Sequence, residues 1–220
     1  MAFIDVYLIS ILMAFLASCA LYFQKKISLA LYFFPPFLLL AFFVEVIGMW
    51  TWYRRINNQW LYIIFTTIEF IYYCWLISEV VEMPSVKKIL YHFMWVYPVL
   101  IAINKMLLQK SMDKYPNISF SLSCLGIACA TMLYFGGLFK SNHYINLIRN
   151  PFFWICSGLL FFYTCSFFGF TISNICYSLY SASPSVIKNY NTVVSLLNIL
   201  LYSSFIIASL CRIKIRKFSS

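Results

Sequence analysis

Seven long apolar segments, separated by short polar ones, make up nearly the whole chain. The apolar segments cover residues 3–23, 30–53, 60–82, 89–108, 119–139, 151–173 and 190–211. Each has about the 20 residues that an α-helix needs to cross the hydrocarbon core of a bilayer. The pattern therefore predicts an all-α protein, a polytopic transmembrane bundle of seven helices that forms a single domain over residues 1–220.

The polar segments carry the basic residues unevenly. The first, third and fifth connections, together with a basic tail at 212–220, hold ten of the sixteen Lys and Arg residues. Positively charged segments are retained in the cytoplasm, so the distribution favours an outside N-terminus and a cytoplasmic C-terminus. No connection is long enough to fold as a separate soluble domain.

The composition supports a membrane location. Of 220 residues, 63% are hydrophobic and 10% are charged, whereas a soluble domain carries roughly 25% charged residues. The formal net charge is +10, which in a soluble protein would raise the question of nucleic acid. Because the basic residues flank apolar segments, the expected partner is the lipid bilayer and not nucleic acid.

Two carboxylates lie where lipid would be expected. Glu45 comes nine positions before Arg54, and Glu69 comes nine positions after Trp60, so each lies about 13 Å from the same membrane boundary. An ionisable residue inside a membrane helix costs about 2.5–3.5 kcal/mol on insertion scales and is a functional candidate by default. Neighbouring carboxylates would suit proton coupling or a cationic or polyol ligand.

Two further polar stripes reach the same depth. In the last apolar segment Asn191, Ser195, Asn198 and Tyr202 are spaced by 4, 3 and 4 residues, which puts them on one helical face. A similar stripe in the third segment contains Tyr62, Thr66, Glu69 and Tyr73. These patterns predict an outward-facing, ligand-binding cavity lined by Glu45, Glu69, Asn198, Thr66, Tyr73, Ser195 and Tyr202. The alternative is that the Ser, Thr and Asn residues bond one another across helices and hold the bundle together.

No catalytic, metal or cofactor site is predicted. A zinc hydrolase needs about three His or carboxylate ligands and a base. The chain has two histidines, His92 and His143, and both are expected near the cytoplasmic face, far from Glu45 and Glu69. The segment 190–211 lacks the lysine that a retinal Schiff base would need. The eight cysteines are not spaced as CxxC and fall mainly in apolar segments, where buried thiols are typical.

The whole chain resembles a group of small bacterial seven-helix membrane proteins without an established activity. The resemblance rests on Glu45 in FFVEVIG, on Asn57 and Asn58 before LYIIFTTIEF, on NPFFWICSGLLFFY, and on Asn198 before LLYSSFIIASLCRI. It implies a multi-pass protein of the bacterial inner membrane. Such proteins are also similar to the seven-helix input modules of bacterial sensor kinases, and a chain without a kinase domain would need a separate signalling partner.

Three functions therefore stay open. The first is a receptor or sensor-like module that binds a small molecule or lipid and acts on a cytoplasmic or membrane signalling partner. The second is a small secondary transporter built as three plus one plus three helices, which predicts pseudo-symmetry between helices 1–3 and 5–7. The third is a lipid enzyme that uses Glu45 and Glu69 as acid and base; a scaffolding or accessory role is a further possibility.

Overall fold

Seven long helices account for almost all of the described chain. The computed structural model describes residues 2–23, 27–104, 117–140, 147–180 and 184–211, with side chains at 6–23, 27–104, 120–140, 147–171 and 192–211. The elements are α1 (Ala2–Cys19), η1 (Ala20–Phe23), α2 (Leu29–Tyr32), α3 (Phe34–Tyr53), α4 (Gln59–Val80), α5 (Pro84–Ile103), α6 (Asn117–Lys140), η3 (Leu147–Arg149), α7 (Pro151–Tyr180) and α8 (Pro184–Cys211). All of these are helical, and seven are long and apolar enough to cross a membrane. The predicted all-α, seven-helix fold is confirmed at this level, and it indicates a multi-pass membrane protein.

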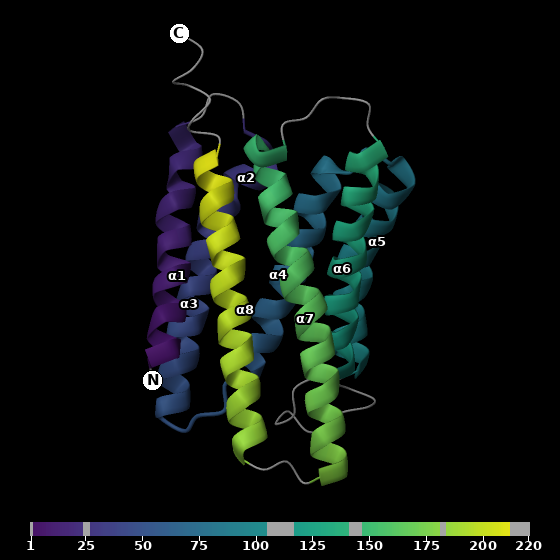
Figure 1. The fold of residues 1–220 in the computed structure, drawn as a ribbon. Coiled ribbons are helices and arrows are strands. Elements are labelled where there is room, and N and C mark those ends of the chain that lie inside the picture. The colour runs from purple at the N-terminus through teal and green to yellow at the C-terminus, as the bar shows by residue number, and fades with distance from the viewer. Residues whose placement is uncertain (1, 24–26, 105–116, 141–146, 181–183, 212–220) are drawn as a thin grey trace.

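The helices form two rows, in which helices consecutive along the chain run antiparallel while the neighbours α1 and α8 run in the same direction (Figure 1). Figure 1 shows α1, α8, α7 and α6 in the near row, with α3, α4 and α5 behind them. α8 packs between α1 and α7, while α4 contacts α3, α5 and α6. Because the number of long helices is odd, α1 begins at one end of the bundle and α8 finishes at the other (Figure 1).

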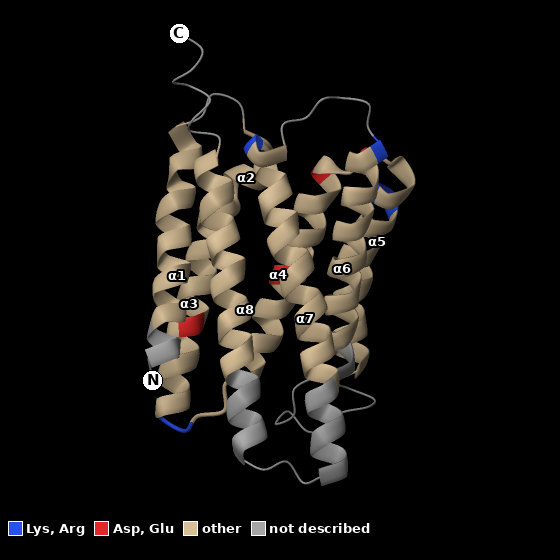
Figure 2. Ribbon diagram, viewed as in Figure 1, with Lys and Arg blue, Asp and Glu red and all other residues tan. Residues whose placement is uncertain are grey.

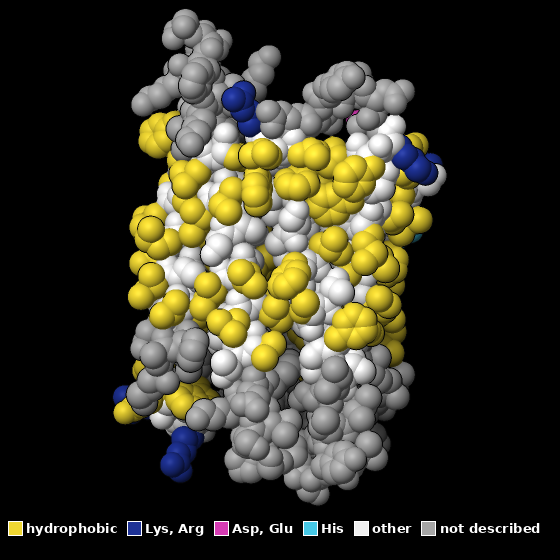
Figure 3. All heavy atoms as spheres, in the orientation of Figure 1, with side chains coloured by type: hydrophobic (Ala, Val, Ile, Leu, Met, Phe, Trp, Pro, Cys, Tyr) yellow, Lys and Arg dark blue, Asp and Glu magenta, His cyan; other side chains and the backbone are white. Residues whose placement is uncertain are grey.

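The outer surface suits a lipid environment. Acidic positions within the helices are few and isolated, and the described Lys and Arg residues lie at the two ends of the bundle (Figure 2). Apolar side chains cover the visible flank between these ends (Figure 3). Trp95 on α5 is 79% exposed, and Ile9 and Phe168 are likewise turned outward. An apolar surface of this extent would aggregate in water but is stable against lipid tails.

Several helices extend beyond the apolar segments that identified them. α5 begins at Pro84 instead of residue 89, and α8 begins at Pro184 instead of residue 190. Proline is favoured in the first helical turn because its missing N–H has no intrahelical partner there. Hydropathy therefore located the part of these helices that suits the bilayer, whereas α5 and α8 begin earlier, at a proline.

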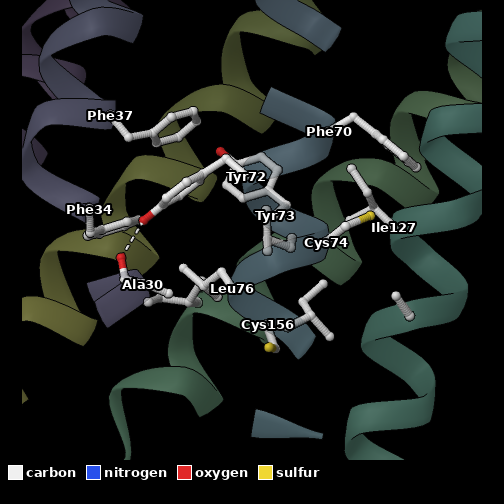
Figure 4. Packing of buried hydrophobic residues seen from close by; sticks show 14 of the residues in the cluster. Ala30, Phe34, Phe37, Phe70, Tyr72, Tyr73, Cys74, Leu76, Ile127 and Cys156 are labelled. Atoms are coloured by element: carbon white, nitrogen blue, oxygen red, sulfur yellow. Dashed lines mark hydrogen bonds between the residues drawn. The ribbon is translucent and has the colours of Figure 1, made fainter. Parts of the chain in front are cut away.

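The connection between α1 and α3 is held against α4. Ala30 in α2 donates its backbone N–H to both carboxylate oxygens of Glu79, at 3.2 and 3.3 Å. The Tyr72 hydroxyl donates to the Ala30 carbonyl at 2.9 Å, as the dashed line in Figure 4 shows. Both backbone groups of one residue are thus satisfied by α4 side chains, which stabilises a short helix that could not persist alone.

The connection between α3 and α4 is a tight helix-terminating turn. The Ile56 N–H donates to the Thr51 carbonyl at 2.9 Å, and the Arg55 N–H donates to the Trp52 carbonyl at 3.0 Å. Arg55 adopts a left-handed φ of 56°, so the turn has the two hydrogen bonds and the backbone conformation of a Schellman motif. This turn returns the chain directly into α4 and places Asn58 beside α3.

Aromatic side chains fill the middle of the bundle. Phe37 stacks on Tyr72 with ring centroids 4.1 Å apart, and Phe34 meets Phe205 of α8 edge-on at 5.1 Å. Tyr73 meets Tyr163 of α7 at 6.0 Å. Figure 4 shows Phe34, Phe37, Tyr72 and Tyr73 converging from α3 and α4. We call Phe34, Phe37, Tyr72, Tyr73 and Phe205 the aromatic core.

Candidate functional site

An open pocket lies at the end of the bundle where α1 begins and where α3 joins α4. Its volume is about 450 Å³, within the range of small-molecule sites. The described side chains that line it come from α1, α3, α4, α8 and the α3–α4 connection: Tyr7, Glu45, Gly48, Met49, Trp52, Asn58, Tyr62, Val194, Ser195 and Asn198. We call it the Glu45 pocket.

Glu45 is the carboxylate of this pocket, and two tyrosines hold it. The Tyr62 hydroxyl donates to Glu45 Oε2 at 3.3 Å, and the Tyr7 side chain of α1 lies close to the same carboxylate. Glu45 is only half-buried. Three helices thus meet at one carboxylate that is still within reach of the open pocket.

Gly48 allows Tyr62 to approach Glu45. A Cβ atom at Gly48 would overlap the Tyr62 hydroxyl oxygen and lie 2.9 Å from Tyr62 Cζ. The Gly48 carbonyl also accepts hydrogen bonds from Asn58 Nδ2 at 2.9 Å and from Thr51 Oγ1 at 2.9 Å. The glycine therefore serves two purposes, since its missing side chain admits the tyrosine and its backbone anchors the α3–α4 connection.

We expect Gly48→Ala to push the Tyr62 hydroxyl away from Glu45 and to destabilise the protein by about 1–3 kcal/mol, as overpacking usually does. Unfolding in detergent measures this loss. The double variant with Tyr62→Phe should recover part of it, because the overlapping oxygen is then gone. An unchanged stability in Gly48→Ala would contradict this arrangement of Tyr62.

Glu69 lies deeper and does not belong to the described lining of the Glu45 pocket. The side chains of Tyr73 on its own helix and of Tyr163 on α7 lie close to the Glu69 carboxylate. Tyr73 is 1% and Tyr163 is 3% exposed. Glu69 itself is half-buried, as Glu45 is. Two buried hydroxyl groups, each of which needs a hydrogen-bond partner, therefore lie beside this carboxylate at the edge of the aromatic core.

Tyr7 and Tyr202 lie between the two carboxylates. The Tyr7 side chain lies close to Glu45 and to Tyr202 of α8, and the rings of Tyr7 and Tyr202 are 6.1 Å apart. Tyr202 in turn lies close enough to Glu69 for an electrostatic interaction. Neighbouring polar side chains from five helices thus extend from the pocket to the aromatic core. We call them the tyrosine series: Glu45, Tyr62, Tyr7, Tyr202, Glu69, Tyr73 and Tyr163.

The predicted cavity residues separate into two groups. Glu45, Ser195 and Asn198 line the Glu45 pocket. The other four, Glu69, Thr66, Tyr73 and Tyr202, are not among its described lining. Thr66 donates to the Tyr62 carbonyl of its own helix at 2.8 Å.

The small hydroxyl groups mostly bond within their own helices. Ser157 donates to the Phe153 carbonyl and Ser203 to the Ile199 carbonyl, each at 2.7 Å and four residues back. Even Asn198 donates its amide to the Val194 carbonyl, at 3.0 Å. Hydrogen bonds between elements include those of Tyr62, Tyr72, Asn58 and Glu79 described above.

The sequence interpretation left Tyr7, Tyr163, Trp52 and Asn58 out of the site. The available signal was weak: a tyrosine hydroxyl deep in an apolar segment must find an acceptor, and the chain offers two carboxylates at that depth. Which tyrosine meets which glutamate depends on helix rotation, which a single sequence does not determine.

Within the described residues no three His, Cys, Asp or Glu side chains are grouped to hold a metal ion.

Comparisons with models of protein families, with curated proteins and with solved structures found no match for this chain. The resemblance to small bacterial seven-helix proteins therefore stays a prediction, and the function has to be argued from the geometry of the site.

Proposed function

We propose that this chain is a receptor-like membrane module that binds a small ligand in the Glu45 pocket and transmits occupancy through helix packing. The observation that carries the proposal is the tyrosine series, in which Glu45, a pocket residue, is joined to interior side chains of four other helices. A ligand that engages Glu45 competes with Tyr7 and Tyr62 for its oxygens. The positions of α1, α4 and α8 would then depend on whether the pocket is occupied.

The proposal includes a location and an orientation. We place the seven helices in the bacterial inner membrane, with the beginning of α1 outside and the end of α8 in the cytoplasm. The excess of Lys and Arg at the α8 end supports this orientation. The Glu45 pocket would then face the outside, and a cytoplasmic or membrane partner would read the opposite end.

A receptor suits the pocket better than a transporter does. Beyond the pocket the bundle is filled by the aromatic core, where Tyr73, Phe34 and Phe205 are each at most 1% exposed. A transporter would have to open a path through these packed rings, whereas a receptor needs a pocket at one end. A lipid enzyme with Glu45 and Glu69 as acid and base is less well supported, because Glu69 is not part of the described lining.

A thermal-shift screen of purified protein in detergent tests the proposal. We expect at least one small polar compound to raise the unfolding temperature, and Glu45→Gln to abolish that rise. Glu82→Gln is the matched control, because it removes the same charge from an exposed residue near the opposite end of α4. If every ligand-induced shift persists in Glu45→Gln, the Glu45 pocket is not the binding site.

Coupling is tested separately with Tyr7→Phe, which removes the hydroxyl between Glu45 and Tyr202. We expect this variant to retain binding but to lose the ligand-dependent change in spacing between labels at the cytoplasmic ends of α1 and α8. The same change in Tyr7→Phe as in the unmodified protein would count against the tyrosine series as the route of transmission.

A further inference from the structure

We propose that the ligand of the Glu45 pocket carries a small organic ammonium group, held by the Glu45 carboxylate against aromatic walls. This inference rests on the proposed function and specifies the ligand's class. Among the described residues that line the pocket, Glu45 is acidic and no side chain is basic. A cation entering the pocket would therefore meet a complementary charge, whereas an anion would meet a repelling one.

Aromatic rings supply the second half of such a site. Tyr7, Tyr62 and Trp52 come from α1, α4 and α3 and line the pocket together with the carboxylate. Aromatic faces attract ammonium groups through their quadrupoles, and cages of this kind bind quaternary ammonium ligands. The Tyr62 hydroxyl donates to Glu45 and the Tyr7 side chain lies close to it, so both rings stand next to the charge that they would share in binding.

A bare metal ion fits the pocket less well. Calcium takes 6–8 oxygen ligands, commonly including several carboxylates, and the described lining offers one carboxylate. The pocket volume of about 450 Å³ is also far larger than an ion requires. The amide of Asn198 and the side chain of Ser195 lie on the α8 wall, where they can contact the polar part of an organic molecule.

A second cavity of about 200 Å³, between α4, α5 and α6, does not compete as a site. Its described lining is apolar or thiol-bearing, with Phe70, Leu90, Phe93 and Gly126 among the contributors. Such a hollow on the outer flank of a membrane bundle offers no polar group to orient a ligand.

The ammonium group can belong to a free molecule or to a lipid headgroup. Choline in detergent solution represents the free source. Phosphatidylcholine against phosphatidylglycerol in nanodiscs represents the lipid source. The neutral alcohol in which carbon replaces the choline nitrogen is the matched control, since it keeps the size and shape of choline and removes the charge.

We expect choline to raise the unfolding temperature at millimolar concentration, in line with binding to the folded state alone, and the neutral alcohol to bind about tenfold more weakly or not at all. Glu45→Gln should remove the preference for the cation, while Glu82→Gln should keep it. A headgroup source would appear instead as stabilisation by phosphatidylcholine over phosphatidylglycerol that Glu45→Gln abolishes.

Two results would overturn the inference. If the alcohol and choline stabilise the protein equally, the pocket binds ligands without selecting charge, so the ligand class is wrong while the receptor proposal stands. If neither choline nor phosphatidylcholine has an effect that depends on Glu45, the ammonium assignment fails, and the broader ligand screen decides the proposed function independently.

Discussion

Replacing Gly158 with alanine should destabilise the bundle by about 1–3 kcal/mol, the usual cost of overpacking. A Cβ atom at this position would overlap the Ser204 hydroxyl oxygen, lie 2.9 Å from Ser204 Cβ and lie 3.4 Å from Leu201 Cδ1. The Ser204 hydroxyl cannot simply rotate away without cost, because it donates to the Leu201 carbonyl at 2.7 Å. α7 would have to move away from α8, which it contacts extensively. Unfolding in detergent measures the loss.

Gly136→Ala is the matched control for this prediction. Nothing lies within 4 Å of a Cβ atom built at Gly136, so alanine there should be neutral or stabilise its helix by up to about 1 kcal/mol. Pairing Gly158→Ala with Ser204→Gly should recover part of the lost stability, because the Cβ atom then moves from one helix to the other. Equal effects at Gly158 and Gly136 would contradict the close contact between α7 and α8.

Replacing Glu69 with leucine should cost about 1–3 kcal/mol for each hydroxyl that loses its partner. Tyr73 and Tyr163 are both buried, and their side chains lie close to the Glu69 carboxylate, which can accept a hydrogen bond from each hydroxyl. Leucine fills much of the same space but accepts no hydrogen bond, so two tyrosine hydroxyls would be left in an apolar interior. The loss should appear as a lower unfolding free energy in detergent.

The triple variant Glu69→Leu, Tyr73→Phe, Tyr163→Phe tests the reason for that loss. Removing all of the polar partners together can be nearly neutral, whereas removing one of them strands the others. We therefore expect the triple variant to be more stable than Glu69→Leu alone. Glu82→Leu, at an exposed position, controls for the loss of a carboxylate. If the triple variant is less stable than the single one, Glu69 is not satisfied by these tyrosines.

Hydropathy was sufficient to predict the seven helices because each apolar segment must form a helix to satisfy its backbone in lipid. It also identified Glu45 and Glu69, since a carboxylate in such a segment is rare. Glu45 on α3 and Asn198 on α8 both line the Glu45 pocket. Depth depends on counting along a helix, and a sequence supplies that count directly.

Hydropathy and depth along a helix could not predict how each helix is rotated or which helices are its neighbours. α3 and α4 are consecutive, yet Glu69 lies beside Tyr73 of α4 and Tyr163 of α7 and is not part of the described lining of the Glu45 pocket. The close contact at Gly158 depends on Ser204, which is 46 positions away along the chain. Pairs of this kind become apparent when two helices are placed side by side.

Two adjacent positions on α8 test most directly whether the Glu45 pocket is open to water. Ser195 lines the pocket, whereas Leu196 is 45% exposed on the outer surface at nearly the same depth. A charged, membrane-impermeant thiol reagent is added to intact cells that express Ser195→Cys or Leu196→Cys, and mass spectrometry counts the labels added beyond those on the parent protein. We predict one additional label on Ser195→Cys and none on Leu196→Cys. No additional label on Ser195→Cys, or equal labelling of the two variants, would contradict an outward-facing, water-filled pocket at Glu45.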